Sequence, residues 1–132
     1  MTNYWLNLIN LVDSDICTFC EIECESLLHL FWSCRYAADF WGQIERWWSN
    51  KTGYMMYLER NDVFIGSSKF TKLQNHILIL GKYCIYSARC KKVIPSFLKF
   101  ETKLFITLKM EENIARENNR IDTFIDKWSI LI

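Results

Sequence analysis

The sequence predicts an all-α fold in which a small module built around cysteine and histidine packs on a helical C-terminal part. Apolar residues recur at helical spacing along most of the 132-residue chain, and no alternation of period two is long enough to indicate a sheet. Three cysteines and a histidine also gather within one short N-terminal stretch. Hydrophobic residues make up 51% of the chain, which is enough to bury a sizeable core.

The first predicted helix spans residues 1–11, because Tyr4, Trp5, Leu8 and Ile9 fall on one helical face. Aspartate and serine at 13–15 end it. The next segment has the pattern C-x2-C-x8-H-x4-C, formed by Cys17, Cys20, His29 and Cys34. Three thiols and one imidazole are the full ligand set of a closed tetrahedral zinc site, so we expect one structural zinc ion in this CCHC module.

The spacing of the four residues constrains the backbone between them. Two residues between Cys17 and Cys20 allow a tight turn to direct both sulfurs at one point. His29 lies in a predicted short helix, and on a continuous α-helix Cys34 would point roughly 140° away from it. We therefore expect a break between them, with Ser33 as the N-cap of the next helix and Cys34 in its first turn.

Two other interpretations of this segment exist. In the first, the thiols are ordinary buried cysteines beside a core histidine, with no metal. In the second, Cys24 replaces one of the four ligands, because the C-x3-C spacing from Cys20 can also reach a common ion.

Four further helices are expected after the cysteines. The first runs from Cys34 to about residue 50 and stops at Gly53, and residues 54–68 are the least regular stretch. A long helix over residues 69–91 ends before Pro95. Ser96 caps a third helix that reaches about residue 118, and residues 121–131 form the last. We divide the chain into a zinc-binding module, 1–60, and a helical C-terminal region, 61–132.

The residues around the predicted ligands resemble the zinc-binding domain that follows the reverse transcriptase of non-LTR (LINE-type) retrotransposons. That family carries C-x-x-C, an E-[ST]-x-x-H-L-F segment, a further cysteine and an F-W pair. Here these are Cys17 to Cys20, Glu25 to Phe31, Cys34, and Phe40-Trp41. The resemblance implies that Cys17, Cys20, His29 and Cys34 bind the metal, and that the region helps a polymerase to engage template nucleic acid.

The sequence favours a non-catalytic role. It contains no adjacent aspartate pair of the polymerase type, no nuclease-like carboxylate cluster, no phosphate-binding glycine loop and no GxSxG motif. We expect no small-molecule substrate. We also expect no membrane association and an intracellular location, cytoplasmic or nuclear, because no secretory signal is evident and zinc-bound thiols suit a reducing compartment.

The net charge of +1 conceals an asymmetry. Residues 1–63 carry four basic and nine acidic side chains, whereas residues 64–132 carry twelve and six. The predicted contacts to RNA or DNA phosphates are five basic residues in the second half: Arg89, Lys91, Lys92, Lys99 and Lys103. The same residues could instead form a solvated face, or face acidic residues of the N-terminal half.

Three functional hypotheses follow. The first is zinc-dependent binding of nucleic acid with low sequence specificity, with a retrotransposon polymerase region as a possible partner. The second is a structural or protein-interaction module that zinc only holds together. The third is a relic retrotransposon fragment without selected function. Among the aromatic residues, Trp41 and Trp48 are candidates for stacking on bases, although helical spacing favours a core position for most rings.

Overall fold

The computed structural model describes all 132 residues and contains helices, loops and one isolated antiparallel bridge between Ile16 and Cys24. The predicted all-α class is therefore confirmed. The helical segments in chain order are α1 (Asn3–Leu8), a π-helical turn η1 (His29–Ser33), α2 (Arg35–Thr52), α3 (Arg60–Ile65), α4 (Lys72–Cys90), α5 (Phe97–Glu117), α6 (Ile121–Trp128) and a final 3₁₀ turn η2 (Ser129–Leu131).

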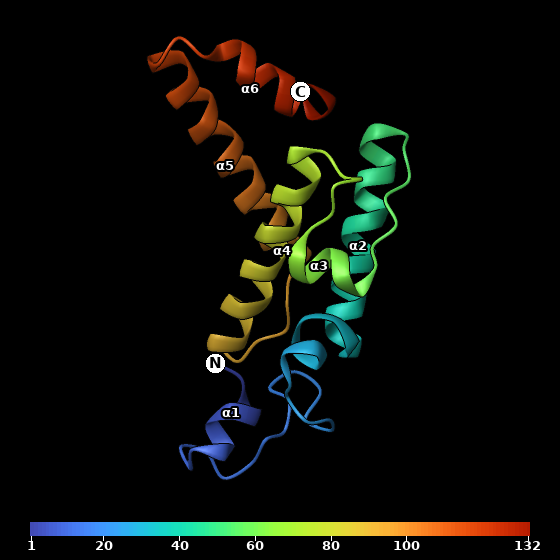
Figure 1. The fold of residues 1–132 in the computed structure, drawn as a ribbon, viewed down its shortest axis with the longest axis vertical. Helices are drawn as coiled ribbons and strands as arrows, with labels where there is room; N and C mark the ends of the chain where they lie inside the picture. Colours follow the sequence, from blue (N-terminus) through green and yellow to red (C-terminus); the bar gives the residue numbers. More distant parts are fainter.

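The molecule is elongated, with α1 and the cysteine-rich loop at one end and α6 at the other (Figure 1). Helix α4 runs through the middle; it packs against α3 and α5, and α6 folds back on α5. One continuous cluster of buried apolar side chains extends from Cys17 to Trp128. The two predicted regions, 1–60 and 61–132, thus share one core, and the boundary between them stays a prediction.

Local capping signals set the ends of the long helices. Gly53 ends α2 in the left-handed conformation, with φ of 78°, as predicted. The Ser96 hydroxyl accepts the Lys99 N–H at 3.4 Å and starts α5. Helix α4 starts slightly later than predicted, because Thr71 and Gln74 form a capping box immediately before and within its first turn.

The stretch 54–68, predicted as irregular, contains the short helix α3. Its start is fixed by a capping box between Glu59 and Asp62, and its Val63 side chain is fully buried. None of the helices combines the length and the apolar character that crossing a bilayer requires.

Trp41 of α2 packs closely against Gly81 of α4. A β-carbon added at Gly81 would lie 2.5 Å from the Trp41 ring. The Trp41 indole N–H donates to the Phe31 carbonyl at 2.7 Å, which holds the ring in place. Trp41 and Trp48 are each only 2% exposed. The suggestion that these two rings stack on bases is therefore wrong; they belong to the core.

We predict that Gly81→Ala destabilises the protein by about 1–3 kcal/mol, because the new methyl group overpacks against the Trp41 ring. Gly42→Ala in α2 is the matched control, since its β-carbon would meet only the flexible end of Arg46, at 3.4 Å. That control should be neutral or slightly stabilising. Denaturant unfolding of both variants measures the difference, and equal stabilities would contradict the packing described for α2 and α4.

Candidate metal centre and basic hollow

The first two cysteines lie on a compact loop closed by backbone hydrogen bonds. The Cys17 N–H donates to the Glu23 carbonyl at 2.8 Å, and the Glu21 N–H donates to the Cys17 carbonyl at 3.0 Å. Glu21 adopts the left-handed conformation, with φ of 58°, which turns the chain sharply after Cys20. The loop directs the sulfurs of Cys17 and Cys20 to the same side.

The other two residues approach through a widened helical turn. The Cys34 N–H donates to the His29 carbonyl at 2.8 Å, a hydrogen bond that spans five residues instead of four. Cys34 then leaves the helical conformation, with ψ of 135°, and α2 begins at the next residue. The predicted break between His29 and Cys34 is thus present. Ser33 is not the N-cap, because it still belongs to the π-helical turn and Cys34 occupies the capping position.

The four predicted ligands meet at one point. Their donor atoms all lie within 4.8 Å of one another. The sulfurs of Cys17 and Cys34 are 3.9 Å apart, and the Cys20 sulfur lies 3.3 Å from Nε2 of His29. Donors bound at about 2.0–2.3 Å in a tetrahedron lie about 3.5–3.8 Å apart, so the group could hold one metal ion. Cys24 is exposed and lies outside the group, so the structure does not support it as a rival ligand.

The two cysteines of the loop have opposite electrostatic environments. Burial raises the pKa of Cys17 to about 12. Burial also opposes ionisation of Cys20, but the backbone N–H groups of Glu23 and Ile22, together with the His29 ring, lower its pKa to about 6. Without a cation, Cys17 favours the neutral thiol; a bound metal would favour the thiolate that a ligand must be.

A buried carboxylate links the metal-ligand loop to the rest of the protein. Glu25 is fully buried and accepts the N–H of Asn3 at 2.8 Å and of Thr18 at 2.6 Å. It also pairs with Nε of Arg89 on α4 at 2.9 Å. Although burial opposes the charge, these donors hold the pKa of Glu25 below its ordinary value. Glu25 thereby joins α1, the loop and α4.

The structure separates the five basic residues that were predicted to contact phosphate. Arg89 is engaged in the buried pair with Glu25, so we leave it out of the phosphate-binding set. Lys91, Lys99 and Lys103 line one hollow of about 160 Å³ between α4 and α5, which we call the basic hollow. Lys92 is exposed but does not line it.

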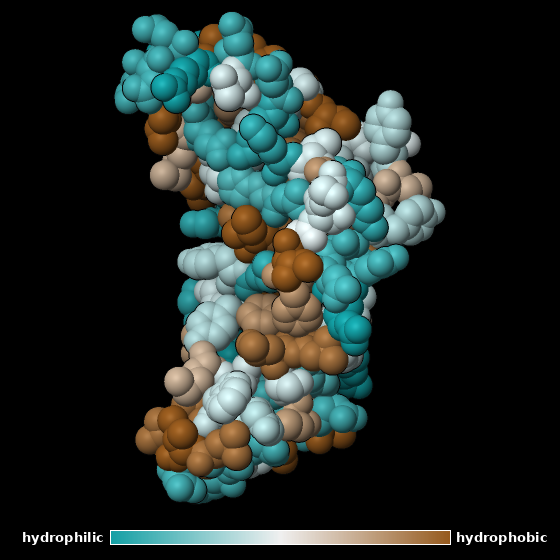
Figure 2. Space-filling model, in the orientation of Figure 1, coloured by the Kyte–Doolittle hydropathy of each residue, from teal (hydrophilic) through white to brown (hydrophobic).

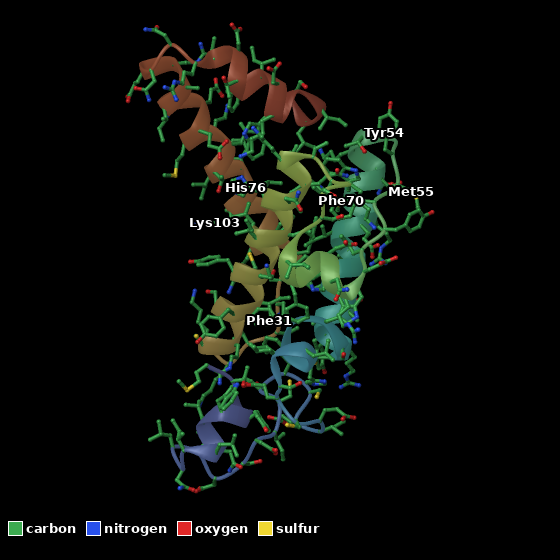
Figure 3. All side chains as sticks on the ribbon, in the orientation of Figure 1. Phe31, Tyr54, Met55, Phe70, His76 and Lys103 are labelled. Carbon is green, nitrogen blue, oxygen red and sulfur yellow. The ribbon has the colours of Figure 1, made fainter.

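The residues that line the basic hollow are of types that can bind an anion. Besides the lysines, its lining includes Ser87, Ser96 and the buried Cys84. None of the three lysines forms an ion pair with a carboxylate. Figure 3 shows Lys103 on the side of the molecule away from Tyr54 and Met55.

Comparison with models of protein families, with curated proteins and with solved structures gives no match to this chain. The resemblance to the zinc-binding domain of retrotransposon reverse transcriptases therefore rests on the motif alone. Arg89 faces an acidic residue of the N-terminal half, one of the alternatives that the sequence left open for the basic residues. The sequence did not indicate that Glu25, the first residue of the E-[ST]-x-x-H-L-F segment, would anchor the loop.

We predict one tightly bound metal ion per chain, and its loss in Cys34→Ser, because that change removes a buried donor of the four-residue group. Cys24→Ser is the matched control and should keep the full metal content, since Cys24 is exposed and outside the group. Elemental analysis of the purified variants tests this, and the reverse pattern would exclude the ligand set.

We predict that Arg89→Met destabilises the protein by about 3–5 kcal/mol, because it leaves the buried Glu25 carboxylate without its cation. Arg116→Met removes the exposed partner of Glu112 and should cost at most about 1 kcal/mol. Denaturant unfolding measures both effects, and a similar small cost in both variants would show that Arg89 does not anchor the loop.

The loss of stability caused by Arg89→Met should also depend on pH. Because the pKa of Glu25 is lower in the folded protein than in the unfolded chain, the ionised carboxylate stabilises the fold at pH values above its unfolded pKa. This stabilisation is lost as the pH falls through the pKa of Glu25 in the folded protein. The difference between wild type and Arg89→Met should therefore shrink as the pH falls through the lowered pKa of Glu25 and the carboxylate becomes protonated. A difference that stays constant from neutral pH down to the acid limit of the folded protein would argue against an electrostatic origin.

Proposed function

We propose that this protein is a non-catalytic zinc-binding module that helps to bind nucleic acid with low sequence specificity. The observation that carries the proposal is the pairing of two features: a closed group of four metal donors and a basic hollow whose three lysines have no carboxylate partner.

The donor set supports zinc as the metal and a structural role for it. Three thiolates and one imidazole in tetrahedral arrangement suit zinc, whereas magnesium and calcium favour oxygen donors. Four protein donors leave no open position for a water molecule, so the site offers no metal-activated nucleophile. Reduced thiols at such a site also favour an intracellular compartment.

The surroundings of the basic hollow support phosphate binding. Ser96 caps the 21-residue helix α5, so the positive end of a long helix dipole lies beside Lys99. The hydroxyls of Ser87 and Ser96 can donate hydrogen bonds to phosphate oxygens. Lysine and hydroxyl contacts of this kind position a backbone without reading bases, which accounts for the low specificity.

The motif supports an origin in the C-terminal tail of a retrotransposon reverse transcriptase, with a polymerase region as a partner. The four residues that carry the resemblance are the four whose donor atoms converge. On this proposal the chain contributes template binding and leaves catalysis to the polymerase.

The second candidate is a protein-interaction module, and the apolar surface at the N-terminal end favours it. Trp5, Leu8, Ile9 and Leu11 are each more than half exposed. Figure 2 shows apolar residues gathered at the end of the molecule where α1 lies. A surface of this kind is typical of sites that another protein covers.

We predict that binding to an RNA or DNA oligonucleotide weakens with salt, with a slope of log K against log salt of about −2 to −3 for three phosphate contacts. Lys99→Ala with Lys103→Ala should flatten the slope by about 1.5, because both lysines line the basic hollow. Fluorescence anisotropy at several salt concentrations gives the slope.

Lys51→Ala with Lys72→Ala is the matched control. It removes the same charge from exposed positions that do not line the basic hollow, so the slope should change little. Equal effects of the two double variants would indicate nonspecific attraction. No measurable binding at low salt would reject the nucleic-acid role and leave the interaction module as the better account.

A further inference from the structure

An exposed aromatic ring stands at the rim of the basic hollow. Tyr83 of α4 lines the hollow together with Lys91, Lys99 and Lys103, yet its side chain is 56% exposed. The neighbouring residue in the sequence, Cys84, faces the core and is only 8% exposed. Tyr83 therefore contributes little to the core, and its ring is available to a ligand held by the lysines.

The Tyr83 ring is held beside one of these lysines. Nζ of Lys103 lies 5.2 Å from the centre of the ring, within the range of a cation–π contact. This contact joins α5 to α4 and brings the ammonium group close to the ring. A phosphate bound by Lys103 would thus bring the attached nucleotide close to an aromatic face.

We infer that the basic hollow is a single-strand site in which a base stacks on Tyr83 while Lys91, Lys99 and Lys103 hold neighbouring phosphates. The inference rests on the proposed nucleic-acid function and narrows it to one class of ligand. A basic groove combined with exposed aromatic rings is the general arrangement for binding single strands.

A duplex cannot use this arrangement fully. Its bases are already stacked on one another, so it presents phosphates to the lysines but no free base to the Tyr83 ring. The lysines should therefore contribute to binding of both forms, whereas Tyr83 should contribute only to single strands. This difference distinguishes a single-strand site from nucleic-acid binding in general.

The test is a titration of the full, metal-loaded chain with labelled oligothymidine of about 12 nucleotides and with a duplex of the same length. The single strand should bind more tightly. Tyr83→Leu should weaken single-strand binding by about 5- to 20-fold, because stacking on one ring is lost. It should leave duplex binding and the salt slope unchanged, and Tyr83→Phe should bind like wild type, since it keeps the ring.

Tyr54→Leu is the matched control. Tyr54 is also largely exposed, at 68%, but it lies on the other side of the molecule from Lys103 (Figure 3). It should bind both probes like wild type. Equal binding of the single strand and the duplex, or no effect of Tyr83→Leu while the salt slope persists, would overturn the inference and leave the proposed function intact. No binding of either probe would reject both.

Discussion

The convergence of four donor atoms on one point is the constraint on which the N-terminal half of this fold depends. It requires the tight loop at Cys17 and Cys20 and the widened turn between His29 and Cys34. Cys34 belongs to this group and also occupies the N-cap position of α2, so the group lies where α2 begins. Trp41 of α2 packs against Gly81 of α4, so the helix that begins after Cys34 is anchored in the core.

The buried pair of Glu25 and Arg89 is the second link between the two ends of the chain. It explains part of the charge asymmetry, since one acid of the N-terminal half neutralises one base of the C-terminal half inside the protein. Isolated burial of either group would be costly, and the surrounding N–H donors offset that cost. The lysines of the basic hollow form no ion pair with a carboxylate, so their charge remains available to an anion.

Much of the fold could be predicted from local signals. Helical spacing of apolar residues predicted α2, α4 and α5, and Gly53 and Ser96 predicted two of their ends. The convergence of three cysteines and a histidine that could hold a metal ion was predicted from residue types and spacing. Ser33 was misassigned because an α-helical period cannot represent a turn closed by a five-residue hydrogen bond. Glu25, the partner of Arg89, lies 64 positions away in the sequence. The spacing of residues along a helix cannot predict a contact between residues so far apart. The exposure of Tyr83 could not be predicted either, because only packing shows which rings stay exposed.

X-ray absorption at the zinc edge, on protein purified without added metal, tests the central claim most directly. A closed CCHC centre should give about three sulfur neighbours at about 2.3 Å and one nitrogen at about 2.0–2.1 Å, with no bound water. Absence of zinc, or a shell dominated by oxygen with fewer than three sulfurs, would contradict a structural zinc at Cys17, Cys20, His29 and Cys34.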